Sequence, residues 1–228
     1  MSNFLLASIG RKFMMSITGL FLLVFITVHL ALNLLLIIDD SGELFNLGAH
    51  FMATNPLIKI MEPILGLGFI VHIIWSVIIT YQNWRARPVK YDKQNLGASS
   101  TWASRNMFIL GGMVFAFLVL HVINFFYVMK FAPHSMETVV IDGTTMENGY
   151  KLVSELFINN MLFGIVYILA AVLLTLHLTH GFWSAFQTLG LNNKNWMSRL
   201  KLVAKIFAIA IGVGFSIIPL YFMLGFNN

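Results

Sequence analysis

Five long apolar runs constrain this chain more than any other feature of its sequence. They cover residues 13–38, 57–82, 107–130, 157–186 and 202–224. Each run reaches or exceeds the ~20 residues that an α-helix needs to cross about 30 Å of hydrocarbon. Only 10% of the 228 residues are charged, against about 25% in an average soluble domain. The sequence therefore predicts an all-α fold, a single integral membrane bundle of five transmembrane helices that occupies residues 1–228 as one domain.

Other properties of the sequence exclude several classes of protein. The first run is too long for a cleavable signal peptide and no small-residue cleavage site follows it, so we expect it to remain as a span. The chain has no cysteine, which excludes disulfides, iron–sulfur ligation by this chain and thiol catalysis. The net charge of +5 falls in short connections between the runs, where membrane topology explains it, and we expect no nucleic-acid partner.

The charges of the connections alternate along the chain and predict an orientation. Lysine and arginine gather in the N-terminal segment and in the second and fourth connections, as Arg11, Lys12, Arg85, Arg87, Lys90, Lys93, Arg105, Lys194, Arg199, Lys201 and Lys205. The first and third connections are acidic or mixed, with Asp39, Asp40, Glu43, Glu137, Asp142, Glu147 and Glu155. The interfacial tryptophans fall at the basic ends, as Trp84, Trp102, Trp183 and Trp196. The positive-inside rule then places the N-terminus in the cytoplasm and the C-terminus outside. Of the connections, we expect only the one over 132–155 to carry structure of its own.

One histidine lies inside each of the first four runs, and these are His29, His72, His121 and His177. An ionisable side chain inside a membrane span is expensive, so each indicates a functional site by default. Counted from the predicted outer ends of the runs, His29 and His121 lie about 15–18 Å deep, and His72 and His177 about 24–33 Å deep. These depths pair His29 with His121 in an outer layer and His72 with His177 in an inner layer.

Two imidazoles that face each other across a helical bundle can bind a haem iron from both sides. Such a pair leaves no thiolate and no open coordination position, which favours electron transfer over oxygen chemistry. Two layers would stack two haems along the membrane normal. The simpler interpretation of any one of these histidines is an imidazole hydrogen-bonded to a neighbouring helix. Zinc is a weaker alternative, because no third ligand lies at helical spacing from either pair.

The other histidines have less specific interpretations. His180 lies one turn after His177 on nearly the same face and competes with it as a ligand, although its position nearer the cytoplasmic side favours contact with a haem propionate or water. His50 lies in the first outer connection, where we expect solvent to reach it, and His134 is expected to be a solvated loop residue. Glycines near the inner histidines would let a flat macrocycle approach the backbone, although they also serve ordinary helix packing; these are Gly66, Gly68 and Gly181.

Four segments of the chain together resemble one family. They are SIGRK at 8–12, HLALN at 29–33, AHFM at 49–52 and HLTHGFWS at 177–184. With five runs and a histidine in each of the first four, the chain resembles over essentially its whole length the diheme cytochrome b membrane-anchor subunit of succinate dehydrogenase and fumarate reductase, the succinate:quinone oxidoreductases.

The resemblance implies a five-helix bundle in the bacterial inner membrane that carries two haem b groups. Carried over, His29 and His121 would ligate the iron of the outer haem, and His72 and His177 that of the inner haem. The family's subunit anchors a flavoprotein and an iron–sulfur protein at the cytoplasmic face. It passes electrons between the iron–sulfur protein and a membrane quinone, and an outer site with two haems favours menaquinone. The enzyme's dicarboxylate chemistry, which links the tricarboxylic acid cycle to the respiratory chain, would lie on a partner chain.

Quinone reduction takes up protons as well as electrons, so an ionisable group near a haem edge is expected. Glu62, early in the second run, is the one carboxylate drawn into an apolar run. The resemblance makes Glu62 and the nearby His50 the candidate catalytic residues of a quinone site. The alternative for Glu62 is an interfacial acid paired with Lys59.

Two other functions remain open from the sequence. The first is a diheme cytochrome b of a hydrogenase or formate dehydrogenase, but those proteins often place two ligands on one helix, whereas this chain places one in each run. The second is a haem-free transporter, which would carry mid-span carboxylates and matching helix breaks. Here Glu62 lies near the end of a run, and Pro63 and Pro219 do not fall in corresponding positions.

Overall fold

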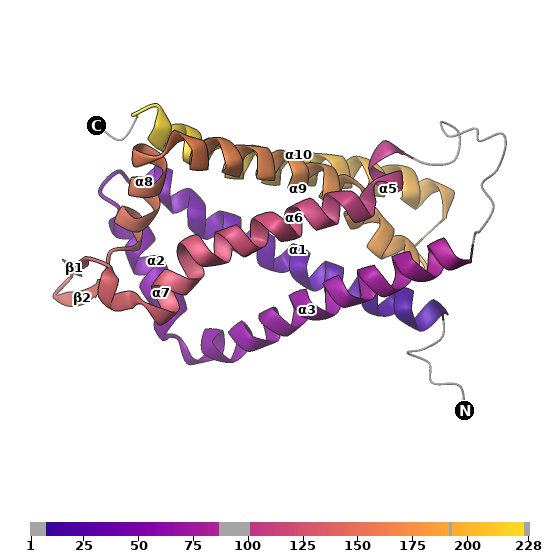
Figure 1. Cartoon of the computed structure of the whole chain (residues 1–228), viewed down its shortest axis with the longest axis horizontal. Coiled ribbons are helices and arrows are strands. Elements are labelled where there is room, and N and C mark those ends of the chain that lie inside the picture. Colours follow the sequence, from indigo (N-terminus) through magenta and orange to yellow (C-terminus); the bar gives the residue numbers. More distant parts are fainter. Residues whose placement is uncertain (1–7, 87–100, 192, 226–228) are drawn as a thin grey trace.

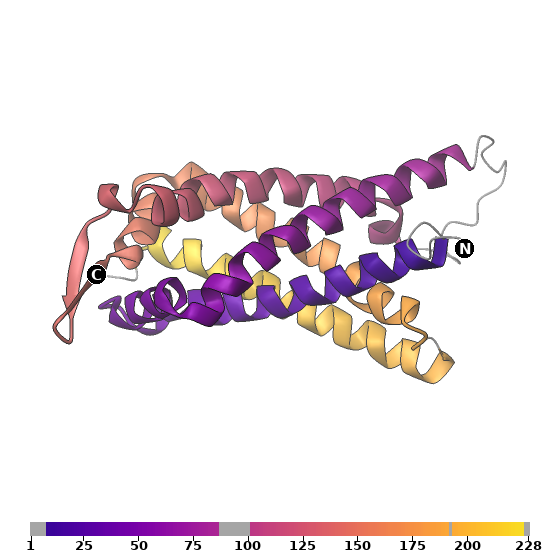
Figure 2. The same cartoon turned by 90° about the horizontal axis from the view of Figure 1, so that it is seen from below.

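The computed structural model of the chain describes residues 8–86, 101–191 and 193–225, and within them five helices are long and apolar enough to cross a membrane. The spans are α1 (Ser8–Ile38), α3 (Pro56–Arg85), the series α6 (Met107–His121), η2 (Val122–Phe126) and α7 (Tyr127–Phe131), α9 (Met161–Thr188) and α10 (Lys194–Met223). All five run roughly along the long axis of the molecule (Figures 1 and 2). The predicted all-helical bundle of five spans is confirmed, and the chain is a multi-pass membrane protein.

Asparagine residues mark where three of the spans begin. The side-chain oxygens of Asn55, Asn160 and Asn193 accept hydrogen bonds from backbone N–H groups in the first turns of α3, α9 and α10, groups that have no partner within the helix. Asn160 also divides the apolar run predicted at 157–186, because its non-helical backbone separates α9 from the preceding helix α8 (Gly149–Asn159). The fourth span therefore begins at Met161, later than the sequence predicted.

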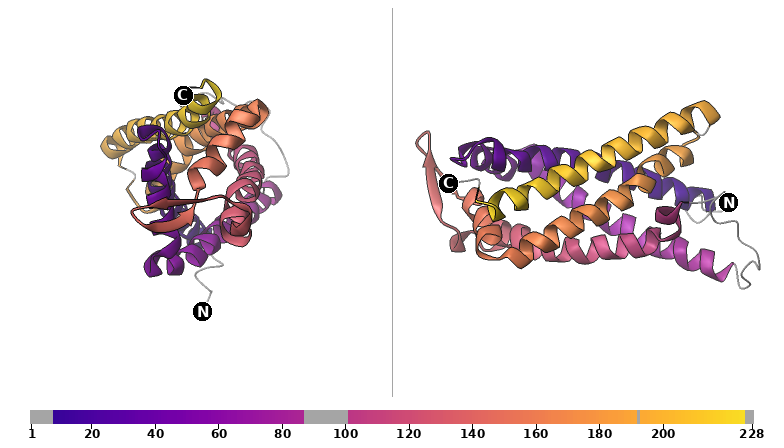
Figure 3. Two further views of the ribbon diagram at one scale, coloured as in Figure 1. Left: turned by 90° about the vertical axis from the view of Figure 1, so that its left-hand side faces the viewer. Right: turned by 90° about the horizontal axis from the view of Figure 1, so that it is seen from above.

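The connections at one end of the bundle fold into a cap. It consists of α2 (Glu43–Thr54), η3 (Pro133–Ser135), the strands β1 (Thr138–Ile141) and β2 (Thr144–Glu147), and α8. Figure 3 shows this end face-on in its left view, and we call it the cap end; the end that carries α5 (Trp102–Arg105) is called the opposite end. The prediction that only the connection over 132–155 carries structure is wrong, because the first connection forms α2, whose Phe45 and Asn46 are buried.

The two strands of the cap form an antiparallel hairpin in which Ile141 pairs with Thr144. The two residues between them, Asp142 and Gly143, both have positive φ, at 49° and 75°. This backbone matches the right-handed twist of the flanking strands, and Asp-Gly is one of the sequences that adopts it most readily. The Asp-Gly dipeptide is therefore a sequence signal for this hairpin.

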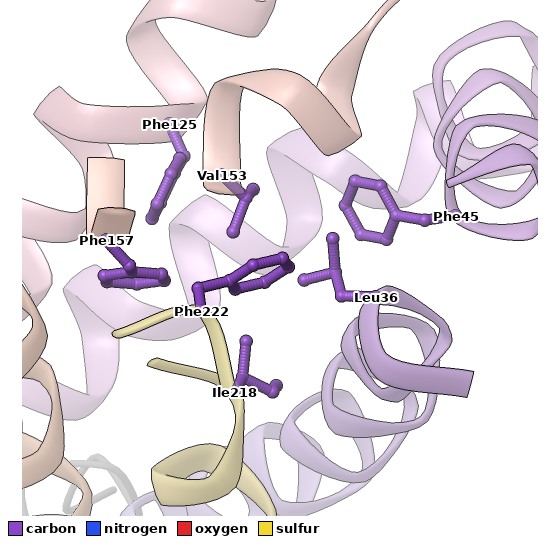
Figure 4. Packing of buried hydrophobic residues seen from close by; sticks show 7 residues of the cluster. All are labelled: Leu36, Phe45, Phe125, Val153, Phe157, Ile218 and Phe222. Carbon is purple, nitrogen blue, oxygen red and sulfur yellow. The ribbon is translucent and has the colours of Figure 1, made fainter. Parts of the chain in front are cut away.

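Aromatic and aliphatic side chains join the cap to the bundle. Seven buried residues from α1, α2, η2, α8 and α10 form one cluster, shown in Figure 4: Leu36, Phe45, Phe125, Val153, Phe157, Ile218 and Phe222. A second cluster lies deeper in the bundle, between α1, α9 and α10, and contains Leu23, Leu178, Ala208 and Ile211. Burial of these side chains fixes α10 against the rest of the bundle and fixes the cap over one end.

The two ends of the bundle differ in charge. The described basic residues of the N-terminal segment and of the second and fourth connections belong to the opposite end, together with the four interfacial tryptophans, except that Lys205 lies eleven residues into α10. The acidic residues of the first and third connections belong to the cap end. Arg87, Lys90 and Lys93 lie outside the described residues. The charge asymmetry that underlies the predicted orientation is therefore a property of the folded chain along its bundle axis.

Candidate functional site

The helix ends of the structure define two levels of histidine. His29 lies 9 residues from Ile38, the last residue of α1, and His121 lies 10 residues from Phe131, the last residue of α7. His72 and His177 each lie 16 residues from the first residue of their span, Pro56 or Met161. At a rise of 1.5 Å per residue, the first pair lies about 14–15 Å and the second about 24 Å from the cap ends of their spans. We call these pairs the near layer and the far layer.

In the near layer, the imidazoles of His29 on α1 and His121 on α6 form an edge contact with each other. Their ring centroids are 5.6 Å apart and their planes are perpendicular. Two imidazoles bound to opposite sides of one metal have centroids about 6 Å apart, because each metal–nitrogen bond is about 2 Å long and the centroid lies about 1 Å beyond the nitrogen. The two side chains therefore already stand at nearly the separation that a shared metal requires.

Aromatic rings surround this pair. Phe25 stacks on His29 with a centroid distance of 5.3 Å, and Phe117 and Phe125 lie 5.9 Å and 5.4 Å from His121. Tyr167 of α9 lies 6.0 Å from the same ring. This apolar wall excludes water from the imidazoles and gives a flat aromatic ligand surfaces to pack against.

In the far layer, each histidine lies against a glycine of the span that precedes its own. The Cε1 atom of His72 would lie 3.6 Å from a Cβ placed on Gly19, and that of His177 would lie 3.5 Å from a Cβ placed on Gly111. Gly19 precedes His29 by ten residues on α1, and Gly111 precedes His121 by the same ten residues on α6. The same arrangement therefore occurs twice in the bundle. His72 of α3 packs against Gly19 of α1, and His177 of α9 packs against Gly111 of α6.

Three imidazole nitrogens within the described residues are buried without a hydrogen-bond partner: Nδ1 of His121, of His177 and of His180. A buried polar atom left unpaired costs about 1–3 kcal/mol, and such atoms in a native protein call for an explanation such as a bound ion. Imidazole nitrogen is a donor that suits iron, copper, nickel and zinc. No group of three or more metal-binding side chains gathers anywhere in the described part of the chain, which argues against a tetrahedral zinc site there.

His180 belongs to a different environment from the two layers. Its ring packs edge-on against Trp183 at 4.8 Å, and the Lys201 ammonium lies 4.9 Å over that indole. This group of side chains lies nearer the opposite end than His177 does. The position of His177 against Gly111 favours His177 over His180 as the member of the far layer.

The residues expected at a quinone site lie on two different helices, Glu62 on α3 and His50 on α2. Glu62 forms an ion pair with Lys130 of α7 at 2.7 Å, not with Lys59, so the alternative partner suggested by sequence proximity is wrong. His50 lies in the helix α2 and is half-buried, so the expectation of a solvent-accessible loop position is wrong. His134 is exposed in η3, as expected.

The glycines that lie near the inner histidines in the sequence do not contact those histidines in the structure. A Cβ on Gly66 would meet nothing within 4 Å, one on Gly68 would meet Phe21, and one on Gly181 would meet Met107. The glycines that contact the far histidines are Gly19 and Gly111, which lie on other helices. Proximity along the chain does not identify the glycine that a histidine contacts, because the contact is made between different spans. The sequence signal for Gly19 and Gly111 is their shared position ten residues before His29 and His121.

Comparisons of the chain with protein-family models, with curated proteins and with solved structures find no match.

Proposed function

We propose that this chain is the membrane-anchor, haem-carrying and quinone-reacting subunit of a succinate:quinone oxidoreductase. The observation that carries the proposal is the arrangement of four histidines from four different spans in two layers. The 5.6 Å separation of His29 and His121 is the most specific part of it. A bis-imidazole site without an open coordination position suits electron transfer.

In this proposal His29 and His121 hold one haem b, and His72 and His177 hold the other. A haem supplies a one-electron carrier that the polypeptide itself lacks. The residues of the chain orient the imidazoles, exclude water through the aromatic wall of the near layer, and set the two levels about 10 Å apart along the bundle axis.

The ends of the bundle suit different partners. The basic opposite end would face the cytoplasm of a bacterium and receive the iron–sulfur and flavoprotein subunits, on which the dicarboxylate chemistry would take place. A quinone, which we propose to be menaquinone, would react on the cap side of the near layer. Glu62 lies six residues from the cap end of α3, about 9 Å along the helix. Glu62 and His50 of α2 are the candidate groups for proton exchange with the quinone.

Haem stoichiometry and histidine substitution test this function. We expect the reduced, purified complex to show low-spin haem b spectra with close to two haems per chain. His29→Ala or His121→Ala is expected to remove one haem, and His72→Ala or His177→Ala the other, because a bis-imidazole site fails when either ligand is lost. His134→Ala, at an exposed histidine, is the control and is expected to leave both haems in place.

Two results would overturn the proposal. A chain that binds no haem in any preparation would favour the haem-free transporter. Co-purification with a nickel or molybdenum protein, in place of a flavoprotein of the succinate-oxidising type, would reassign the chain to the hydrogenase or formate dehydrogenase class. Retention of both haems in His177→Ala alone would move that ligand to His180.

A further inference from the structure

A buried threonine on α1 contacts the far histidine of α3. The Oγ1 atom of Thr18 lies 3.2 Å from Nδ1 of His72, and the Thr18 residue is only 8% exposed. The same Oγ1 atom lies 2.9 Å from the carbonyl oxygen of Met14 and 3.2 Å from that of Met15. Thr18 therefore joins the backbone of its own helix to an imidazole of the next span.

The hydrogen of the Thr18 hydroxyl can be assigned from these distances. A hydroxyl has one hydrogen to donate and two lone pairs that accept. The shortest of the three contacts runs to a backbone carbonyl, which can only accept, so the hydroxyl donates to Met14 in the manner usual for threonine within a helix. Toward His72 the oxygen is then an acceptor, and Nδ1 of His72 must carry the hydrogen that it receives.

We propose that Thr18 is a positioning residue that fixes the tautomer of His72. With the hydrogen held on Nδ1, the lone pair of the imidazole stands on Nε2, which is the nitrogen left for a metal. A hydrogen bond from Nδ1–H also raises the basicity of the ligating nitrogen and holds the ring plane. The metal in question is the haem iron of the far layer, so this inference rests on the proposed function.

Thr18 gives His72 a support that the other three histidines lack. The amide nitrogen of Asn33 lies 3.4 Å and 3.5 Å from the two ring nitrogens of His29, so it does not distinguish between the tautomers of that ring. Nδ1 of His121 and Nδ1 of His177 are buried with no partner. The two axial positions of the far layer are therefore unequal, with His72 the stronger electron donor.

The test uses three variants of the full chain in its complex. Thr18→Val removes the hydroxyl at nearly constant shape, and Thr18→Ser keeps it. Thr27→Val is the matched control. The Thr27 hydroxyl makes the same bond to its own helix, 2.8 Å to the Leu23 carbonyl, and it has no hydrogen bond to a histidine among the described residues. Potentiometric titration of the two haems is the first measurement, since a change in helix stability alone would not move one potential selectively.

We expect Thr18→Val to raise the midpoint potential of one haem and leave the other unchanged, because a less basic His72 stabilises the ferric state less. Thr18→Ser is expected to have the wild-type midpoint potentials. Thr27→Val is also expected to leave both midpoint potentials unchanged. Equal potentials in the wild type and Thr18→Val would overturn the proposal while leaving the haem-carrying function intact. The same selective shift in Thr18→Ser, which keeps the hydroxyl, would overturn the proposal as well.

A second measurement does not depend on haem. Histidine-selective ¹⁵N NMR of the full chain prepared without haem is expected to show His72 as a single tautomer with hydrogen on Nδ1, and a mixture of tautomers in Thr18→Val. If the chain takes up no haem, the proposed function fails, and these spectra still decide the role of Thr18. A mixture of tautomers in the wild type would contradict it.

Discussion

At the scale of single residues, the histidines inside the spans are polar groups that are energetically costly to bury in a membrane. A lipid-embedded bundle offers few polar partners, so each ring nitrogen is satisfied by a side chain of the same chain, by a ligand, or not at all. Thr18 satisfies one nitrogen of His72, whereas Nδ1 of His121 and Nδ1 of His177 have no partner. Such unsatisfied groups are tolerated where function requires them.

One prediction at this scale concerns Asp39, which lies just beyond α1. The Leu44 backbone N–H donates to its carboxylate at 2.9 Å, and the Ser41 hydroxyl and backbone N–H donate at 2.7 Å and 3.1 Å. These bonds, that from Leu44 first, lower the pKa of Asp39 below its ordinary value of 3.8. Because the folded pKa is lowered, the stabilisation is fully present above the unfolded pKa and is lost as the pH falls through the folded one.

We therefore expect Asp39→Ala to reduce protection of the first-turn amides of α2 against hydrogen exchange at pH 6–7. The difference from the wild type should shrink below about pH 4 and disappear once Asp39 is protonated in both folded and unfolded states. Glu147→Ala, at an exposed strand position, is the control. A difference that stayed constant down to pH 2 would show that the charge of Asp39 plays no part.

At the scale of elements, small residues decide how closely α9 and α10 approach. Ala204, Ala208 and Gly212 recur every four residues on α10, and the two alanines are fully buried. This spacing places small side chains in one row, which lets two membrane helices pack backbone to backbone. A Cβ on Gly212 would clash with the hydroxyl of Thr175 and lie 3.3 Å from the carbonyl oxygen of Ala171.

Gly212→Val is expected to destabilise the bundle by about 1–3 kcal/mol, the usual cost of overpacking. The Thr175 hydroxyl cannot easily move away, because it is bonded to the Ala171 carbonyl at 2.8 Å. Gly66→Val is the matched control, since a Cβ there would meet nothing within 4 Å. The measurement is the midpoint of thermal denaturation of the purified protein; equal midpoints for the two variants would refute the close-packing argument.

The third span contains a local change of helix type. The α-helical pattern of α6 ends at His121, and the next five residues, Val122–Phe126, form a π-helix before α7 resumes. A π-helical turn widens the helix and is found frequently at functional sites. Within it, the Asn124 amide donates to the Tyr167 hydroxyl at 3.1 Å, which ties the span to α9 beside His121. The sequence of this segment, VINFF, contains no residue pattern that predicts a π-helical turn.

At the scale of the whole molecule, the charge difference between its two ends predicts how it lies in the membrane. From the positive-inside rule we expect the basic opposite end to face the cytoplasm and the cap to face outward. Because the natural chain has no cysteine, single cysteines report the orientation without background.

We expect Thr145→Cys, exposed on the hairpin, to react with a membrane-impermeant maleimide in intact cells. Ser198→Cys, exposed in the first turns of α10, should react only after the membrane is permeabilised. Each variant is the control for the other, because both side chains are exposed in the structure. The reverse labelling pattern would invert the orientation and place the proposed subunit dock on the wrong side of the membrane.

The sequence by itself determined the number of spans, their approximate limits and the presence of one histidine in each of the first four. These properties are local, because an uncharged stretch of about 20 residues must become a helix once it enters lipid, whatever its neighbours are. The tertiary structure decided the rest: the break at Asn160, the ion pair of Glu62 with Lys130, and the seating of His72 against Thr18 and Gly19. The ion pair and the position of His72 each join residues from different spans. The residue pattern of one helix carries no information on which face of another helix will pack against that helix.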